Sequence, residues 1–404
     1  MNKDLENKID EILTRGVNEV IKKDHLKERL LSGEKLRIKF GIDPTSPYLH
    51  LGRAIALLKL KDLQELGHKI VIIIGDFTGV IGDSSDKESE RPILEKKTVE
   101  KNLKTYKDQI GKILDVDKVK FHRNSEWLKD LNYEEISKQA DIFSLAEFIA
   151  RDNIKKRLKD DSRISLRELL YPLMQGYDSV AVEADLEIGG TDQRFNLLSG
   201  REMQRTYKQK PQDVLMVNLI EGTDGRKMSS SWGNTVNLLD EPNEMLGKIM
   251  SMGDELIIKY FIHCARIPMD EIRKIEDGMK NEKINPRDAK IKLAEEIVKI
   301  YHGKEKARKA KEYFISTFSE KKIPDDVAEI KVAQDEIKLT EFLVLSKTAN
   351  SLGEARRKIG QGGVEISGKK EMDWRRVLKR NDNGAIVKVG KKDFVKVVFL
   401  GIEL

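Results

Sequence analysis

The chain has 404 residues, 39% of them apolar and 36% charged, which predicts a globular protein of two or three domains. No run approaches the roughly 18 apolar residues that a membrane helix needs, and the charged, periodic N-terminus does not have the pattern of a signal peptide. The single cysteine, Cys264, excludes an internal disulfide and favours a reducing cytoplasm. We interpret it as a small buried side chain rather than as a nucleophile.

The N-terminal part of the sequence predicts alternating helices and strands. Apolar spacing predicts one helix over residues 2–31, followed by a strand over 36–40 and a helix over 51–66. The unbroken β-branched run "IVIII" at 70–74 is typical of a parallel strand that is buried on both faces. This order predicts a βαβ unit and an α/β fold with a Rossmann-type, doubly wound parallel sheet.

The chain from residue 1 to 325 divides into two predicted domains. We expect a Rossmann-type domain over 1–231, with a charged helical insertion at about 84–165 that contains a possible short strand, "KVKFHR". A second buried strand, "VLMVNLI", follows the insertion. We expect a helical domain over 232–325 and a polar linker over 326–337.

The C-terminal segment, residues 338–404, is basic. It carries 15 Lys and Arg against 8 Asp and Glu, a net charge of +7, whereas the rest of the chain sums to about −1. Short helices and three strand-like segments predict a small α+β domain with a polyanion as its partner. Arg356, Arg357 and Lys358, beside glycines, can contact RNA phosphates. Ordinary solvated surface charge is the alternative.

The stretch "FGIDPTSPYLHLGR", residues 40–53, joins the first strand to the second helix. A helix N-terminus has unpaired N–H groups and favours phosphate. Thr45, His50 and Arg53 can donate hydrogen bonds to phosphate oxygens, and Gly52 leaves room for a flat ligand. In the alternative interpretation, His50 only caps the helix and Asp43 only shapes the turn.

The stretch "YPLMQGYD" places Tyr171, Gln175 and Asp178 at positions i, i+4 and i+7 of a predicted helix. The three side chains therefore share one face. An aromatic ring, an amide and a carboxylate together can recognise a small polar aromatic ligand, although an exposed amphipathic face has the same pattern.

Two loops complete the candidate site. In "EIGGTDQRFN" the glycines permit a close approach, while Asp192 and Gln193 can bind a ribose or an amino acid; a sharp glycine turn is the alternative. The loop "KMSSS", residues 227–231, offers a cation and three hydroxyl groups that suit pyrophosphate. An ordinary solvated loop would have a similar composition.

These stretches, in this order, resemble the bacterial tyrosyl-tRNA synthetases, which are class I enzymes. "HLGR" resembles the HIGH motif of the family and "KMSSS" its KMSKS motif. "YPLMQGYD" and "GGTDQ" are similar to the helix and loop that hold tyrosine and adenylate. The basic tail resembles the small RNA-binding domain first described in ribosomal protein S-four, so the likeness covers nearly the whole chain.

The resemblance implies a role for each matching residue. The implied catalytic residues are Thr45, His50, Arg53, Lys227 and Ser230, and the implied ATP-binding residues are Gly41, Asp43, His50, Gly52, Gly190, Asp192, Lys227 and Met228. The implied tyrosine-binding residues are Asp83, Tyr171 and Gln175 at the ammonium group, Gln193 near the carboxylate, Asp178 at the phenol, and Lys39.

The sequence departs from the family pattern at three positions. Arg53 stands where the HIGH motif has its second histidine, and Ser230 where KMSKS has its second lysine, so that Lys227 is the only motif cation, with Arg226 beside it. Lys39 stands where one branch of the family has a tyrosine that touches the substrate phenol. A second bacterial branch, which this sequence resembles more closely, has lysine there.

The resemblance implies a cytoplasmic homodimer, built through the insertion, that activates tyrosine with ATP and charges tRNA(Tyr). Mg²⁺ would arrive with ATP, bound mainly by phosphates and water, and no dedicated metal site is expected. Two alternatives remain: a tryptophanyl-tRNA synthetase, against which Asp178 and the tail argue, and a non-catalytic RNA-binding protein with a synthetase fold.

Overall fold

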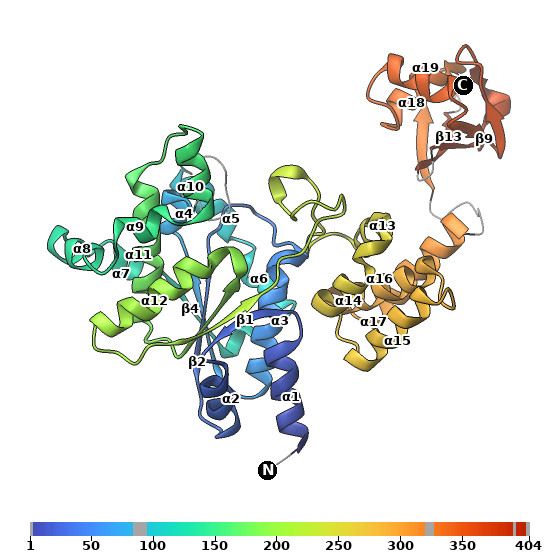
Figure 1. Cartoon of the computed structure of the whole chain (residues 1–404). Coiled ribbons are helices and arrows are strands. Elements are labelled where there is room, and N and C mark those ends of the chain that lie inside the picture. Colours follow the sequence, from blue (N-terminus) through green and yellow to red (C-terminus); the bar gives the residue numbers. More distant parts are fainter. Residues whose placement is uncertain (1–2, 84–94, 320–326, 391–392, 401–404) are drawn as a thin grey trace. The chain divides into compact units, whose positions relative to one another are not determined.

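Six of the described strands form one sheet, in the order β1-β6-β5-β2-β3-β4, in the computed structural model (Figure 1). Strands β2 to β6 are parallel, and β1 pairs antiparallel with β6 at one edge. Their bounds are β1 Val17–Ile21, β2 Arg37–Ile42, β3 Lys69–Ile74, β4 Val119–Arg123, β5 Leu186–Gly190 and β6 Asp213–Val217. The structure describes residues 3–83, 95–319, 327–390 and 393–400. The predicted Rossmann-type α/β fold is confirmed.

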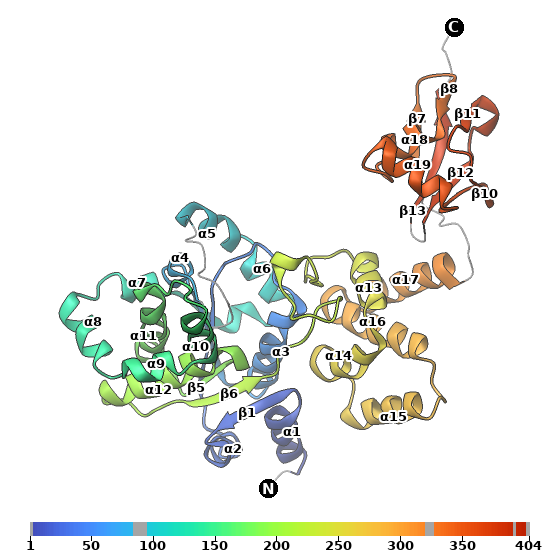
Figure 2. The same ribbon diagram turned by 45° about the horizontal axis from the view of Figure 1, so that its top comes forward.

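Helices cover the sheet and hold its strands in place (Figures 1 and 2). Helix α3, Leu51–Glu65, packs on β3 and β5, and α12, Arg194–Thr206, packs on β5 and β6. Helix α11, Leu166–Ala181, lies against α12. The two helices approach closely at Gly176, where a Cβ atom would lie 3.2 Å from the backbone oxygen of Ser199.

The N-terminal prediction of one long helix is wrong. The segment forms α1, Lys3–Thr14, then β1, and then α2, Lys23–Leu31. Gly16 and Lys22 adopt positive φ angles of 65° and 63°, which a continuous helix does not allow. Strand β1 exists because it pairs with β6, about 200 residues later in the chain, and such distant pairing overrides local periodicity.

The predicted insertion contributes a strand to the central sheet. The short strand predicted in "KVKFHR" is confirmed as β4, which pairs parallel with β3. The described helices of this region are α5 Lys96–Leu103, α6 Tyr106–Gly111, α7 Ser125–Leu128, α8 Tyr133–Ala140, α9 Leu145–Ile149 and α10 Asp152–Lys159. The start of the predicted insertion, residues 84–94, lies outside the described residues.

A helical region follows the sheet. It contains α13 Pro242–Ser251, α14 Ile257–Cys264, α15 Met269–Lys280, α16 Pro286–His302 and α17 Lys304–Phe314. Cys264 is buried in α14, as predicted, and burial raises the pKa of its thiol. A thiol with a raised pKa is a poor nucleophile.

Residues 308–404 form a second compact unit, separate from residues 1–307. Its larger sheet has the order β10-β9-β12-β13-β7, and β11 pairs with β8. The bounds are β7 Ala328–Val332, β8 Glu336–Lys338, α18 Leu339–Leu345, α19 Leu352–Gly360, β9 Val364–Ile366, β10 Lys369–Glu371, β11 Val377–Lys379, β12 Ile386–Val389 and β13 Asp393–Phe399. Buried apolar side chains, among them Phe342, Ile359 and Val397, form its core.

The predicted linker over 326–337 needs correction, because β7 and most of β8 lie in it. Strand β7 pairs parallel with β13, with Ala328 opposite Val395. It is an edge strand whose side chains are mostly outside the core, so its polar composition resembled that of a linker.

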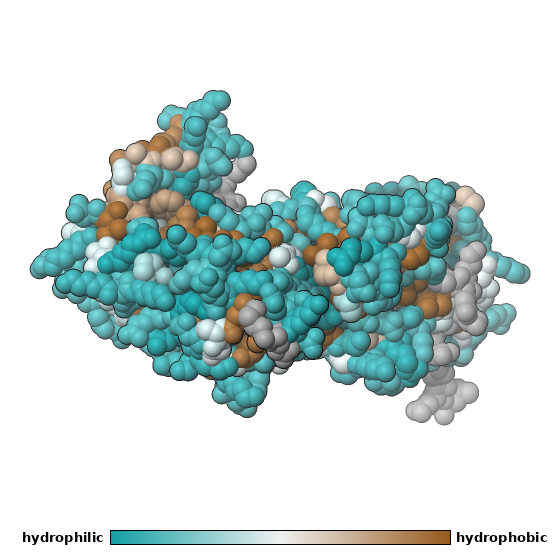
Figure 3. Space-filling model, turned by 60° about the horizontal axis from the view of Figure 1, so that its bottom comes forward, coloured by the Kyte–Doolittle hydropathy of each residue, from teal (hydrophilic) through white to brown (hydrophobic). Residues whose placement is uncertain are grey.

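Hydrophilic residues cover most of the surface drawn in Figure 3, with apolar residues in smaller areas between them. Among the described helices, none has the length and apolar character that crossing a membrane requires.

Candidate active site

A cavity of about 600 Å³ opens at the carboxyl ends of β2 and β5. In an open parallel sheet, ligands bind where the strand order reverses direction, and β2 lies at that point here. Sixteen of the predicted catalytic, ATP-binding and tyrosine-binding residues line this one cavity: Gly41, Asp43, Thr45, His50, Gly52, Arg53, Asp83, Tyr171, Gln175, Asp178, Gly190, Asp192, Gln193, Lys227, Met228 and Ser230.

His50 is the residue before the first turn of α3. Its imidazole makes no capping hydrogen bond with the part of the chain that the structure describes, which argues against the capping interpretation. Burial lowers the pKa of His50 to about 3, helped by the nearby charges of Arg53 and Lys227, so the imidazole is neutral at pH 7. A Cβ atom at position 52 would lie 3.1 Å from His50 Nδ1, so Gly52 leaves room for the ring.

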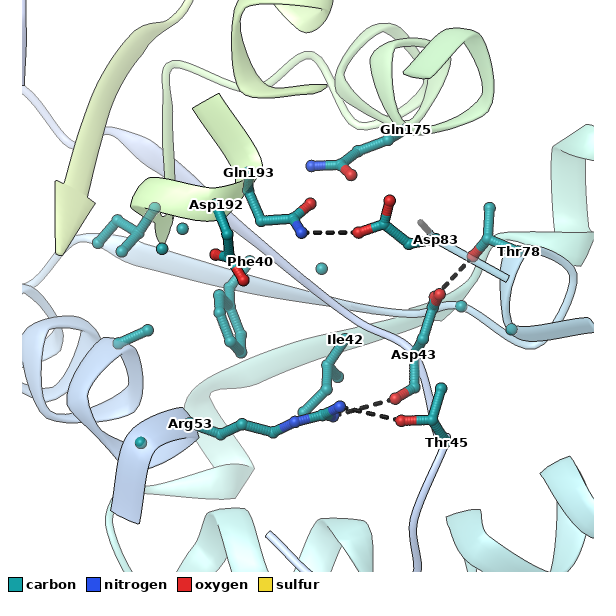
Figure 4. A pocket seen from close by; sticks show the side chains of 18 of the residues that line it. Phe40, Ile42, Asp43, Thr45, Arg53, Thr78, Asp83, Gln175, Asp192 and Gln193 are labelled. Carbon is teal, nitrogen blue, oxygen red and sulfur yellow. Dashed lines mark hydrogen bonds between the residues drawn. The ribbon is translucent and has the colours of Figure 1, made fainter. Parts of the chain in front are cut away.

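Arg53 fixes the turn that precedes α3 (Figure 4). Its guanidinium group donates hydrogen bonds to the backbone oxygen of Asp43 and to Thr45 Oγ1, both at 3.0 Å. The residue that departs from the HIGH motif therefore holds Thr45 in place at the cavity wall.

The carboxylate of Asp43 is held from two sides. Thr78 Oγ1 donates to its Oδ1 and the Tyr171 hydroxyl donates to its Oδ2, both at 2.8 Å. A Cβ atom at Gly75 would overlap both Asp43 and Thr78. Burial raises the pKa of Tyr171, so its hydroxyl stays protonated as the donor. Sequence reasoning missed Thr78, because no motif surrounds it.

Lys227 reaches the cavity from the KMSSS loop. Its Nζ lies 3.1 Å from Asp192 Oδ2. Asn234 stabilises the loop: its Oδ1 accepts from Ser229 N at 2.9 Å, and its Nδ2 donates to Asp224 Oδ1 at 2.7 Å. The same Nδ2 donates to the backbone oxygen of Lys227 at 3.1 Å. One side chain thus sets the shape of the loop.

Arg226 is directed to other partners. It pairs with Asp224 at 2.8 Å, and its guanidinium carbon lies 4.9 Å from the ring centre of Trp232. It is not among the described residues that line the cavity, whereas Ser230, where η3 (Ser230–Trp232) begins, is.

The chain after the loop is hydrogen-bonded to the chain before α3. Leu51 N donates to the backbone oxygen of Val236 at 2.9 Å, and Leu238 N donates to that of Leu49 at 2.8 Å. The two signature motifs, far apart in the sequence, are therefore held side by side.

Asp178 lies at the buried end of the cavity, with 4% of its surface exposed. Trp127 Nε1 donates to its Oδ1 at 2.8 Å, and Asn124 Nδ2 donates to its Oδ2 at 3.4 Å. Burial raises the pKa of Asp178 to about 7, against the opposing effect of the Lys39 charge. Sequence reasoning missed Asn124 and Trp127, which follow β4 and belong to no motif.

Gln175, Gln193 and Asp83 lie together at one end of the cavity (Figure 4). Gln193 Nε2 donates to Asp83 Oδ2 at 2.7 Å, and Asn196 Nδ2 donates to Gln193 Oε1 at 2.9 Å. These groups are suited to binding the polar end of an amino acid, since amide and carboxylate oxygens accept hydrogen bonds from an ammonium group.

Lys39 does not lie where it was predicted. It is fully buried and is not among the described residues that line the cavity. Its Nζ donates to the backbone oxygen of Gln175 at 2.9 Å and to Ser179 Oγ at 2.8 Å, and it forms an ion pair with Glu187 at 2.9 Å. It therefore supports the cavity from behind.

The predicted RNA-contacting residues lie on α19 in the second unit. Arg356 and Arg357 are exposed, but Lys358 Nζ donates to the backbone oxygen of Thr348 at 2.7 Å and pairs with Glu354, so it stabilises the fold. Sequence reasoning missed Trp374, whose ring centre lies 4.7 Å from the guanidinium carbon of Arg356 and 4.9 Å from that of Arg375.

Comparison with known proteins places the chain in a family. Residues 31–319 match the family described as tRNA synthetases class I (W and Y), so this part of the chain is that of a class I tRNA synthetase. Residues 320–397 match the family described as the Tyrosine--tRNA ligase SYY-like C-terminal domain.

Full-length relatives distinguish between the two kinds of class I enzyme. The chain is 45% identical to Tyrosine--tRNA ligase of Carboxydothermus hydrogenoformans, over 96% of this chain and 97% of the relative. It is 44% identical to Tyrosine--tRNA ligase of Thermotoga maritima, over 96% of each. The chain belongs to the tyrosine--tRNA ligase family, and the resemblance found in the sequence is confirmed.

Solved structures support the fold. A tyrosyl-tRNA synthetase from Archaeoglobus fulgidus, complexed with L-tyrosine, has a TM-score of 0.61 and 24% identity over 76% of this chain and 100% of its own. A C-terminally truncated mitochondrial tyrosyl-tRNA synthetase from Aspergillus nidulans has a TM-score of 0.64 and 20% identity over 77% of this chain and 94% of its own.

Proposed function

We propose that this chain joins L-tyrosine and ATP to form tyrosyl-adenylate and pyrophosphate, and then transfers tyrosine to the 3′ end of tRNA(Tyr) in protein biosynthesis. One observation supports the proposal: a single cavity is lined by residues at the start of α3, by Lys227 of the KMSSS loop and by the buried Asp178. This grouping also argues against a non-catalytic protein, which would have no need of it.

At the phosphate end, the chain would act by positioning and by charge stabilisation. Thr45 and His50 would donate to ATP phosphates, and Lys227 would neutralise charge as pyrophosphate leaves. Arg53 would act by holding Thr45. The tyrosine carboxylate is itself the nucleophile, so no protein nucleophile is needed.

Mg²⁺ would arrive as part of the ATP complex. Among the described residues, no cluster of three or more His, Cys, Asp or Glu side chains could hold a metal ion. We propose that the ion is bound mainly by phosphates and water.

At the other end, Asp178 would accept a hydrogen bond from the substrate phenol. Asp83, Tyr171 and Gln175 would bind the ammonium group, and Gln193 would lie near the carboxylate. Phenylalanine has no hydroxyl group to donate to the buried Asp178, so its binding is disfavoured relative to that of tyrosine.

Tyrosine-dependent exchange of pyrophosphate into ATP tests the activation step. We expect exchange with tyrosine and far slower exchange with phenylalanine or tryptophan at equal concentration. Exchange that depends on tryptophan, or no exchange with any of the three amino acids, would refute the proposal.

The second unit would bind tRNA through its basic residues. Arg356, Arg357 and Arg375 offer cations, and Trp374, which lies against Arg356 and Arg375, offers an aromatic ring. Such groups bind phosphates and unpaired bases. A chain ending at Ser319 should keep tyrosine-dependent exchange and lose most tRNA charging. Full charging by the shortened chain would refute the role of the second unit.

We also propose a cytoplasmic homodimer. Tyr133, Leu145, Leu158 and Leu166, in the region from α8 to the start of α11, expose large apolar side chains that a second copy could cover. The lone buried Cys264 is compatible with a reducing compartment. Sedimentation should give twice the chain mass for the wild type and the chain mass for L145E/L158E. A monomeric wild type would refute the dimer.

A further inference from the structure

Glu187 is the first residue of the stretch "EIGGTDQRFN", where no role was predicted for it, and it lies at the base of the cavity. It is in β5, directly opposite Lys39 of β2, and both side chains are almost completely buried. Because breaking a buried ion pair is costly, both members are expected to be fixed in place.

The carboxylate of Glu187 is saturated with hydrogen bonds. Its Oε1 receives the Lys39 ammonium at 2.9 Å and Gln175 Nε2 at 3.2 Å. Its Oε2 receives Ser179 Oγ at 3.2 Å, together with Gln212 Nε2. A carboxylate has about four acceptor positions. Glu187 therefore has no capacity left for a ligand, although it borders the cavity.

The contact with Gln175 fixes the direction of an amide group. A carboxylate accepts hydrogen bonds and cannot donate them, so Gln175 must turn its Nε2 toward Glu187. Its Oε1 then points away from the ion pair, and no donor within the described part of the chain is bonded to it. Lys39 reinforces this geometry, because it also donates to the backbone oxygen of Gln175.

The network is closed on the side of α12. A Cβ atom at Gly200 would lie 2.7 Å from Ser179 Oγ and 3.2 Å from Glu187 Oε2, so only glycine leaves space for these polar groups. The fold thus makes room for a buried polar network directly behind a residue of the cavity wall.

We propose that Glu187, paired with Lys39, is a positioning residue: it orients the Gln175 amide so that Oε1 accepts a hydrogen bond from the ammonium group of tyrosine. This inference rests on the proposed function. It assigns amino acid specificity partly to an ion pair that does not touch the substrate.

Glu187→Gln tests the inference, because a neutral amide can donate as well as accept and no longer dictates the direction of Gln175. We expect the affinity for tyrosine, and for tyramine as an inhibitor, to fall about 10-fold or more, the effect of losing a hydrogen bond to a charged group. Hydroxyphenylpropanoate, which lacks the ammonium group, should inhibit the variant and the wild type equally. The KM for ATP should stay unchanged.

Two further variants distinguish a positioning role of Glu187 from a general loss of structure around the cavity. Lys39→Met with Glu187→Gln removes both buried charges, which avoids leaving an unpaired charge, and should show the same selective loss. Ser179→Ala removes another hydrogen bond to the same carboxylate but leaves it an acceptor. It should change the affinities for tyrosine and hydroxyphenylpropanoate by equal factors.

A double-mutant cycle tests whether Glu187 acts through Gln175. In a Gln175→Ala background, Glu187→Gln should have no further effect on tyrosine affinity. Additive effects, or equal losses for tyrosine and hydroxyphenylpropanoate in Glu187→Gln, would overturn the inference. A wild type without tyrosine-dependent exchange would instead count against the proposed function, so the two failures are distinguishable.

Discussion

Replacing Asp178 with Asn should make the protein's stability respond differently to pH. Asparagine resembles the protonated carboxyl group: its oxygen can still accept from Trp127 Nε1, but it cannot ionise. Burial raises the pKa of Asp178 from 3.8 to about 7 in the folded protein. The folded state therefore holds this proton more tightly than the unfolded state does.

The sign and size of the effect follow from linkage. The contribution of Asp178 to folding is most favourable below about pH 4 and falls as the pH rises to about 7, above which it is constant. Between pH 5 and pH 8, the free energy of unfolding of the wild type should fall relative to that of D178N by about 2 to 3 kcal/mol. All other titrating groups are common to both proteins and cancel in the difference.

Urea unfolding of both proteins at pH 5 and pH 8, without ligands, measures this change. The transition of residues 1–307 can be followed by far-UV circular dichroism in a chain that ends at Ser319, which leaves out most of the second unit. A difference that does not vary with pH would show that the Asp178 pKa is not raised. The opposite sign would show that Lys39 lowers the pKa by more than burial raises it.

Three other substitutions probe the phosphate end. Lys227→Ala should slow adenylate formation by about 100-fold in a rapid-quench assay, with little change in tyrosine affinity. Arg226→Ala, the matched control, should have a small effect in the same assay. Equal rates for the two variants would contradict a role for Lys227 in charge stabilisation. His50→Ala should lower kcat and kcat/KM for ATP together. In the wild type, the exchange rate should show no pH transition from His50 between pH 5 and 9, because the pKa of His50 is about 3. A wild-type transition in this range that disappears in His50→Ala would show that the pKa of His50 is higher. Gly75→Ala should abolish exchange and lower the Tm, because the new Cβ would overlap the side chains of Asp43 and Thr78. Gly41→Ala is the control: its Cβ would meet nothing within 4 Å, so the protein without ligands should tolerate it. Similar Tm values for the two variants would argue against the overlap.

The sequence alone predicts those parts of the site whose residues lie close together along the chain. The run in β3 predicts a buried parallel strand because its side chains are apolar on both faces. Tyr171, Gln175 and Asp178 share a helix face because of their spacing alone. The turn from Asp43 to Arg53 carries its own glycine, histidine and helix start.

Residues that depend on strand order could not be found in this way. Asn124 and Trp127 reach Asp178 because β4 lies beside β3, and no local pattern reveals that neighbour. Lys39 was expected to contact tyrosine, but it pairs with Glu187 instead. That pairing arises because β2 and β5 are adjacent in the sheet, which no local pattern in the sequence reveals. The same reason explains the errors at β1 and β7, which are strands only because of distant partners.

The pairing of β7 with β13 has a consequence for synthesis on the ribosome. Strand β7 lies at residues 328–332, but its neighbour is the last described strand, at 393–399. All six strands of the first sheet lie between residues 17 and 217 and leave the ribosome much earlier. Because domains fold as units during synthesis, with the N-terminal one first, we expect the nascent chain to complete its cavity before β7 finds a partner. A chain that stops before β13 would then resemble an adenylate-forming enzyme whose RNA-binding unit lacks the partner of β7.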